Sequence, residues 1–273
     1  TSCKMFQMPG ADEKTGFAHR LWIATTDYWS AEAENIIRDT QPTVTRILLS
    51  DLENAGVDWR KIYQGQSGSR ALQQAKTVRE HQHAAIKTFH QYFQENDRGR
   101  LIMACGTGKT FTALKIMEQQ TNGKGLALFL VPSIALLNQA LNAWMTDAAV
   151  PIFPICVCSD AKASRKRVQI DDSDDMAVVD LALPATTDVN SIVRQLHLAR
   201  EIGGLTVVFA TYQSIDVVSQ AQAILNESTP GSCVFDLIVC DEAHRTTGVT
   251  LKDADESAFV KVHDNDFLPA AKR

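Results

Sequence analysis

The stretch Met103–Met117, MACGTGKTFTALKIM, carries the strongest clue to how this chain folds. Its centre, Gly106 to Thr110, matches the end of the phosphate-loop pattern G-x-x-x-x-G-K-[ST], although Met103 stands where that pattern begins with glycine. An apolar run, RLIMA, precedes the loop, and a helical pattern, FTALKIMEQQ, follows it. Glycines let the backbone turn tightly, and the helix directs its partly positive N-terminus at the turn. The stretch therefore predicts a strand, a phosphate-binding loop and a helix.

The residues of this loop have separate predicted roles. Gly106, Thr107 and Gly108 are expected to present backbone N–H groups to a phosphate. Lys109 is expected to contact the β- and γ-phosphates, and the hydroxyl of Thr110 to ligate Mg²⁺. The predicted cofactors are therefore ATP and Mg²⁺.

A second stretch, FDLIVCDEAH from Phe235 to His244, places two adjacent carboxylates at the end of an apolar strand. In a parallel sheet with a phosphate loop, the carboxyl end of a strand lies where the magnesium of a nucleotide is held. Asp241 is therefore predicted to bind the metal ion. Glu242 is predicted to polarise an attacking water and so to act as the catalytic base.

Short apolar runs recur from residue 100 onward, with helical patterns between several of them. The runs are RLIMA, GLALFLVP, IFPICVC, LTVVFATY and DLIVCDEA. Continuous apolar runs are typical of strands buried on both faces, and strands that alternate with helices indicate a parallel sheet. Just upstream, Ile86, Phe89 and Phe93 recur at helical spacing. The predicted fold class is α/β.

Composition excludes several other classes. The chain has 273 residues, of which 45% are hydrophobic, and contains no apolar run long enough to span a membrane. Its six cysteines form no CxxC pair or zinc-like cluster. The net charge of −5 argues against binding nucleic acid mainly through a strong positive field, but it leaves room for a local phosphate-contacting groove. A cytoplasmic protein without structural metal or membrane partner is expected.

Taken together, the motifs resemble those of superfamily 2 helicases and translocases of the DEAH type. Arg79-x-x-Gln82 resembles the glutamine motif, and the resemblance implies that these residues bind adenine. The loop resembles motif I, and DEAH at Asp241 to His244 resembles motif II. FLVPSIALLNQ and VVFATYQS resemble motifs that touch a nucleic-acid backbone, which implies DNA contacts for Ser133 and Thr211. The resemblance also implies that His244 couples ATP hydrolysis to motion.

The form A-C-G-T-G-K, together with DEAHR, is similar to the motor subunits of ATP-dependent restriction enzymes. The resemblance implies a RecA-like parallel sheet flanked by helices, with residues 79–273 as the first RecA-like domain, incomplete at its C-terminus. A second RecA-like domain, and methyltransferase or specificity domains in the same protein, are the expected partners, along with double-stranded DNA. An arginine finger from the second domain accelerates phosphoryl transfer by about 10³- to 10⁵-fold. This chain by itself is therefore expected to bind ATP better than it hydrolyses it.

The first sixty residues resemble the end of an Mrr-like restriction nuclease domain, which belongs to a restriction-endonuclease-like α/β fold. Strands are predicted at RLWIAT, Arg20 to Thr25, and at TRILLS, Thr45 to Ser50, with a helix over SAEAENIIRD between them. The resemblance is carried by HRLWIATTDYWSAEAENIIRD and TRILLSDLENAGVDW, above all by the phrase T-T-D-x-W-[ST]-x-x-A at Thr25 to Ala33. The resemblance implies a nuclease role for Lys4, whose acidic partner would precede residue 1. We expect residues 1–62 to be the end of the nuclease domain and 63–78 to be a linker.

The leading hypothesis is an ATP-dependent translocase on duplex DNA, fused to a restriction nuclease of the type ISP or type I kind. One alternative is a superfamily 2 helicase of RNA or DNA repair with an inactive accessory domain. Another is a nucleotide-gated binding switch without enzymatic activity. An acidic residue and an [EQ]-x-K motif upstream in the intact protein would favour the restriction-enzyme hypothesis over the repair helicase. Motifs III to VI downstream would exclude the non-enzymatic binding switch.

Overall fold

The computed structural model describes residues 20–30, 32–33, 44–65, 76–158, 183, 185–228, 231, 233–243 and 260–273. Backbone contacts divide the chain into two compact units. The first comprises Thr1–Leu72 with Asp175–Pro184, and the second comprises Gln73–Asp174 with Ala185–Arg273. The division after Leu72 falls inside the stretch 63–78 that was expected to be a linker. The outer boundaries of the expected domains stay a prediction.

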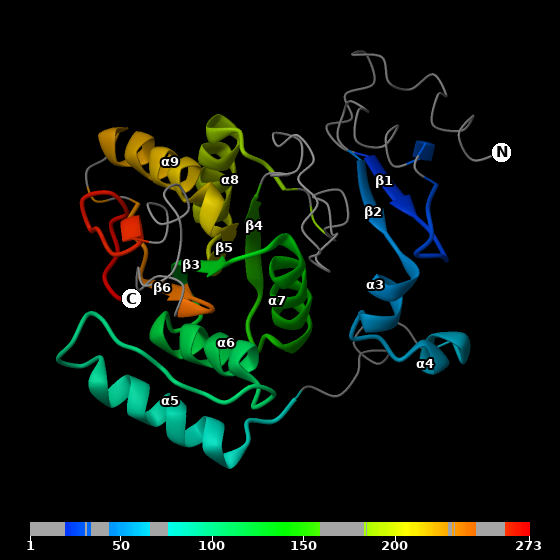
Figure 1. Cartoon of the computed structure of the whole chain (residues 1–273), viewed down its shortest axis with the longest axis horizontal. Helices are drawn as coiled ribbons and strands as arrows, with labels where there is room; N and C mark the ends of the chain where they lie inside the picture. Colours follow the sequence, from blue (N-terminus) through cyan, green and yellow to red (C-terminus); the bar gives the residue numbers. More distant parts are fainter. Residues whose placement is uncertain are drawn as a thin grey trace, which may run out of the picture. The chain divides into compact units, whose positions relative to one another are not determined.

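In the described part of the second unit, four parallel strands form one sheet in the order β4-β5-β3-β6 (Figure 1). The strands are β3 (Gly125–Val131), β4 (Ile152–Val157), β5 (Leu205–Thr211) and β6 (Leu237–Cys240). Every residue of β5 is buried, as the run LTVVFAT, apolar except for Thr206 and Thr211, predicts for a strand covered on both faces. The expected α/β fold with a parallel sheet is confirmed.

Helices cover both faces of this sheet (Figure 1). Helices α6 (Lys109–Gln120) and α7 (Ile134–Asp147) pack against β3, β5 and β6. Helices α8 (Val189–Ile202) and α9 (Ile215–Ser228) pack against β4 and β5. Alternating side chains of β3 serve the two layers, since Leu128 and Leu130 join the core beneath α8 and α9 and Phe129 contacts Trp144 of α7. Helix α5 (Glu80–Tyr92) precedes α6 in the chain, and a short 3₁₀ turn, η4 (Tyr212–Ser214), precedes α9.

Capping residues explain where two of these helices begin. The side chain of Ser133 accepts a hydrogen bond from Leu136 N at the start of α7, and Asp188 accepts one from Ser191 N at the start of α8. The register of the strands brings the carboxyl ends of β3, β5 and β6 to one edge of the sheet, where Leu130 lies opposite Cys240 and Val131 opposite Thr211. The loops that leave this edge carry the residues of the candidate site.

The strand predicted at RLIMA is wrong, because Arg100–Ala104 form no strand. A strand needs a ladder of backbone hydrogen bonds with a neighbour. The N–H of Gly99 donates to Arg273 O at 2.9 Å and the N–H of Arg273 donates to Asp97 O at 2.8 Å, but among the described residues this ladder goes no further. Ile102 is accordingly 84% exposed. An apolar pattern such as RLIMA does not specify which segment a strand would pair with.

In the described part of the first unit, two strands pair in parallel, β1 (Arg20–Ile23) with β2 (Val44–Ile47). Helices α3 (Leu49–Asn54) and α4 (Trp59–Tyr63) follow. Two parallel strands agree with the strand–helix–strand expectation, and most of the helix expected between them lies outside the described residues. The expected strand over 45–50 was too long, because Leu48 N donates to the Asp51 side chain at 2.9 Å and starts α3 there.

Asp27, in the T-T-D phrase, has a structural role that the sequence did not reveal. Its carboxylate accepts hydrogen bonds from the backbone N–H and the hydroxyl of Ser50, at 3.0 and 2.9 Å. Ser50 lies in the first turn of α3, where backbone N–H groups have no partner within the helix. Asp27 therefore caps α3 from a distant loop.

Replacing Asp27 with alanine should destabilise the first unit by about 1 kcal/mol, the usual cost of losing a helix cap. Urea unfolding followed by tryptophan fluorescence reports mainly on this unit, since three of the four tryptophans, Trp22, Trp29 and Trp59, belong to it. Asp27→Asn keeps an acceptor oxygen and should retain most of the stability. An Asp27→Ala transition that coincides with wild type would contradict the capping role.

Candidate nucleotide site

Two glycines give the phosphate loop its shape. Gly106 has φ of 75° and Gly108, the N-cap of α6, has φ of 85°, a left-handed conformation that residues with a Cβ rarely adopt. Space is short at Gly108 as well, because a Cβ there would lie 2.5 Å from Gln82 Nε2. The loop thus leads directly into the N-terminus of α6, whose first residues are Lys109 and Thr110. This is the geometry that binds anions at helix N-termini.

Gln82 contacts the loop through both ends of its amide. Its Oε1 accepts a hydrogen bond from Arg79 N at 2.9 Å, and its Nε2 donates to Thr107 O at 3.0 Å. His81 Nε2 also lies 3.1 Å from Thr107 O. Gln82 is 3% exposed, so its amide mainly holds the loop in place. Its contact with adenine, and that of Arg79, stay predictions. His81 was not expected at the loop, because its place beside Gln82 is the one feature of the sequence that points to it.

Lys109 and Glu242 form an ion pair across the site. Lys109 Nζ lies 3.3 Å from Glu242 Oε1, and both side chains are about one-third exposed, at 37% and 33%. The hydrogen bond to Glu242 is the main reason that the pKa of Lys109 is raised above its ordinary value. The phosphate loop and the acidic strand end, 133 residues apart in sequence, are thus brought together.

The backbone around Asp241 holds the acidic turn in place. Asp241 N donates to Leu130 O at 2.8 Å, and the hydroxyl of Tyr212 donates to Asp241 O at 2.9 Å. Glu242 has φ of 53°, and its N–H donates to Asp241 Oδ1 at 3.0 Å. A positive φ is strained for a residue with a side chain and is often found at functional sites. Burial is the main cause of the raised pKa of Asp241. The support that Tyr212 provides was not expected, although Tyr212 lies in the motif VVFATYQS.

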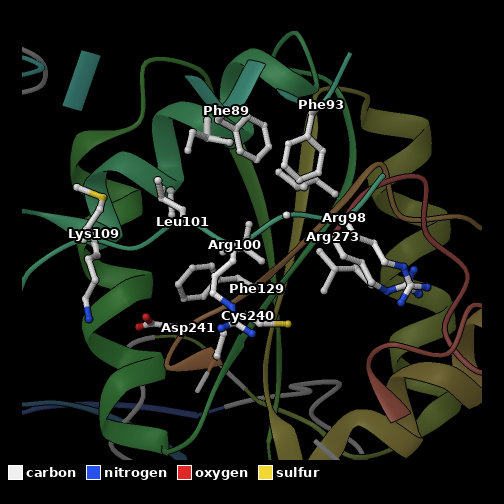
Figure 2. Close-up of a pocket in the computed structure, with 18 of the residues that line it drawn as sticks. Phe89, Phe93, Arg98, Arg100, Leu101, Lys109, Phe129, Cys240, Asp241 and Arg273 are labelled. Carbon is white, nitrogen blue, oxygen red and sulfur yellow. The ribbon is translucent and has the colours of Figure 1, made fainter. Parts of the chain in front are cut away.

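A cavity of about 710 Å³ borders the site. Lys109, Thr110 and Asp241 line it together, and Figure 2 shows the Asp241 carboxylate directed toward the side of the cavity where Lys109 lies. Aromatic and aliphatic side chains line much of the rest, among them Phe89, Phe93, Leu101 and Phe129. Among the described residues no group of three or more His, Cys, Asp or Glu side chains could hold a metal ion. A carboxylate and a hydroxyl nevertheless suit Mg²⁺, which usually keeps several waters and takes few protein ligands beside phosphates.

The residues expected to touch DNA have different environments. Ser133 is half-buried and caps α7 through its oxygen, so its hydroxyl hydrogen can still be donated elsewhere. Thr211 is 3% exposed, and its hydroxyl lies 3.1 Å from that of buried Ser214. Contact between the Thr211 side chain and DNA would require this pair to separate. Both assignments stay predictions, and His244 and Lys4 lie outside the described residues.

No helix in the described part of the chain is long and apolar enough to cross a membrane.

Two solved structures of restriction-modification enzymes are similar to this chain. The solved structure of the ATP-dependent type ISP restriction-modification enzyme LlaBIII bound to DNA matches 96% of this chain at 35% identity, with a TM-score of 0.80. A nuclease-deletion mutant of the type ISP enzyme LlaGI, in complex with a DNA substrate mimic, matches 72% at 40% identity with a TM-score of 0.56. The chain spans 16% of the LlaBIII chain and 17% of the LlaGI chain. The resemblance to ATP-dependent restriction enzymes is thus confirmed.

A probable helicase of African swine fever virus is also similar, at 30% identity over 170 residues. The match covers 62% of this chain and 16% of the viral protein. Residues 5–69 match the family described as restriction endonuclease, Mrr_cat_2, which confirms the expected Mrr-like segment. Residues 75–264 match the family described as "Type III restriction enzyme, res subunit", and they make up more than half of the chain. The chain therefore belongs to this res-subunit family of restriction enzymes.

Proposed function

We propose that the protein uses ATP to move along double-stranded DNA, and that this motor is joined to a restriction nuclease. The observation that carries the proposal is the ion pair between Lys109 and Glu242, formed where the glycine loop meets the acidic end of β6. A lysine on a phosphate loop, opposite a carboxylate at a strand end, is the arrangement that binds and cleaves nucleoside triphosphates. The similarity to LlaBIII, an ATP-dependent enzyme solved in complex with DNA, supports DNA as the polymer along which the motor moves.

Each residue of the site has a role in this proposal. Lys109 would exchange its ion pair with Glu242 for contacts with the β- and γ-phosphates, and Thr110 and Asp241 would hold Mg²⁺. The cation supplies positive charge that offsets the charge of the phosphates. It would also favour the ionised form of Asp241, whose pKa burial raises. Glu242, released from Lys109, would orient the attacking water.

The remaining assignments rest on the family. We propose that Arg79 and Gln82 border the adenine and that Ser133 and Thr211 lie along the DNA backbone. His244 is proposed to couple ATP hydrolysis to movement of the motor.

The proposed domain organisation has a nuclease domain at 1–62, a linker at 63–78 and a motor domain at 79–273. The proposed partners in the same protein are a second RecA-like domain and methyltransferase or specificity domains. The proposed location is the cytoplasm, and the proposed nuclease activity would involve Lys4.

A helicase that separates strands is the second candidate, because the viral relative is described as a probable helicase. Both candidates share the nucleotide site and differ in what happens to the duplex. A translocase displaces a third strand from a DNA triplex without unwinding the duplex, whereas a helicase releases a labelled single strand. Triplex displacement and strand release, each measured with ATP and with a non-hydrolysable analogue, distinguish the two. Displacement that proceeds equally without ATP would refute both.

A further inference from the structure

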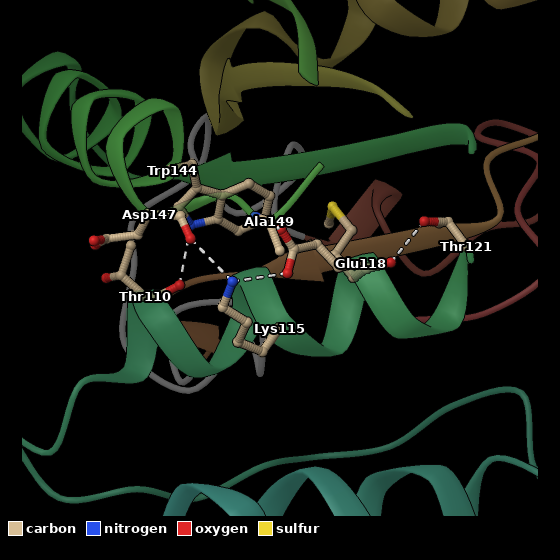
Figure 3. Close-up of polar contacts among 8 residues, drawn as sticks. Thr110, Lys115, Glu118, Thr121, Trp144, Asp147 and Ala149 are labelled. Atoms are coloured by element: carbon tan, nitrogen blue, oxygen red, sulfur yellow. Dashed lines mark hydrogen bonds and ion pairs between the residues drawn. The ribbon is translucent and has the colours of Figure 1, made fainter. Parts of the chain in front are cut away.

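Trp144 contacts the first turn of the phosphate-loop helix. Its indole Nε1–H donates a hydrogen bond to Thr110 O at 3.0 Å, from the last part of α7 to the second residue of α6 (Figure 3). The side chain is completely buried and is the largest fully buried side chain among the described residues. Thr110 is the residue whose hydroxyl is proposed to meet Mg²⁺. A buried tryptophan thus reaches the backbone of a proposed metal ligand.

The indole ring is fixed from the side of the sheet. Its centroid lies 4.8 Å from that of Phe129 on β3 and 5.4 Å from that of Phe209 on β5. Both phenylalanines are also almost completely buried. Closely packed aromatic rings have little freedom to reorient. The direction of the N–H is therefore set by the sheet, not by α6.

A second link joins the same two helices one turn further along α7. Lys115 Nζ, on α6, donates to Asp147 O at 2.9 Å and pairs with Glu118 Oε2 at 2.9 Å (Figure 3). Glu118 Oε1 in turn accepts from Ala149 N, and the Asp147 carboxylate, 4% exposed, pairs with Lys76 at 2.7 Å. The C-terminal part of α7 thus contacts α6 through Trp144 and through Lys115. Of these two contacts, the Trp144 hydrogen bond is the one that reaches the first turn of α6, next to the phosphate loop.

We propose that Trp144 is a positioning residue for Thr110, which it orients toward the magnesium of the bound nucleotide. The indole bond restrains the Thr110 peptide group, and the direction of that peptide fixes where its side chain points. This inference rests on the proposed function, because it assumes a Mg²⁺–nucleotide complex at the loop. A purely structural role would stabilise the fold without favouring the metal-bound form of the nucleotide.

Two replacements at position 144 test the proposal. Trp144→Phe removes the N–H and some volume, and the tryptophan analogue β-(3-benzothienyl)alanine removes the N–H while keeping the ring shape. Binding of ADP to the whole chain is measured by calorimetry, once with excess Mg²⁺ and once with EDTA. Losing one buried hydrogen bond is expected to raise the Kd with Mg²⁺ by about fivefold to tenfold and to leave the Kd in EDTA unchanged. The Mg²⁺ concentration for half-maximal binding should rise with it.

The control is Trp59→Phe, because Trp59 Nε1 also donates to a backbone carbonyl, Leu52 O at 2.8 Å, but in the first unit. It should change neither Kd. Equal weakening with Mg²⁺ and with EDTA in both Trp144 variants, or no weakening in the benzothienyl variant, would overturn the positioning role. Failure of the wild-type chain to bind Mg²⁺–ADP at all would instead refute the proposed nucleotide site, so the two failures are distinguishable.

Discussion

Replacing Lys109 with alanine is expected to weaken ATP binding by about 10- to 100-fold, the value of a hydrogen bond between charged groups. Lys109 is the lysine of the phosphate loop, and its ammonium group lies at the N-terminus of α6, where a phosphate would bind. Its raised pKa keeps it protonated at neutral pH and well above. Titration with a fluorescent ATP analogue measures the change, and ATP-driven displacement of a DNA triplex should be lost with it.

Lys124→Ala is a suitable control for this replacement, because Lys124 is exposed in the turn after α6 and away from the loop. The partner carboxylate should tolerate the loss of Lys109, since partly exposed ion pairs contribute about 0–1 kcal/mol to stability. The midpoint of thermal unfolding is therefore expected to change little. Unaltered ATP affinity and triplex displacement in Lys109→Ala would remove the basis of the proposed function.

Replacing Glu242 with glutamine is expected to have the opposite pattern, with ATP bound and hydrolysis lost. Removing a general base lowers rates by about 10²- to 10⁴-fold. The affinity for ATP should be unchanged or higher, because Lys109 then has no ion pair with Glu242 to break before it contacts the phosphates. Single-turnover hydrolysis of labelled ATP, measured alongside equilibrium binding, separates the two effects.

The comparison with Lys109→Ala makes this prediction specific. If Glu242 served only to hold the lysine, both variants would weaken ATP binding and neither would accumulate bound, uncleaved ATP. Asp241→Asn provides a further contrast, since it should raise the Mg²⁺ requirement, whereas Glu242→Gln should not. Hydrolysis by Glu242→Gln at the wild-type rate would show that another group orients the water.

The sequence was sufficient to predict that the glycine loop and the acidic end of β6 lie at one edge of a parallel sheet, because the carboxyl ends of parallel strands share an edge. The ion pair between Lys109 and Glu242 was not predicted and comes from the structure. The sequence was not sufficient for RLIMA, where a strand depends on a partner that no local pattern specifies. It also could not identify Trp144 or Tyr212. Both look like ordinary core residues in the sequence, and their functional bonds go to backbone carbonyls of distant residues, which any residue type provides.

The predicted DNA contact of Thr211 illustrates a related limit. The motif gives the residue type and its position after β5, but whether a hydroxyl faces solvent depends on the turn that follows. In this chain that turn is the 3₁₀ segment Tyr212–Ser214, which brings Ser214 back to the Thr211 hydroxyl. Side-chain exposure in such a turn is a tertiary property and cannot be read from the motif.

The pairing of Lys76 with Asp147 has a practical consequence for separating the two units. Lys76 is the first described residue of the second unit, and its partner carboxylate is 4% exposed. The Lys76 side chain itself is 65% exposed, so solvent partly screens the pair and its loss should cost about 0–1 kcal/mol. A protease cut on the N-terminal side of Lys76 keeps the pair and should release a stable ATP-binding piece. A cut directly after Lys76, where trypsin cleaves, would leave Lys76 on the N-terminal fragment and Asp147 on the C-terminal one. The C-terminal fragment should then have a lower melting temperature.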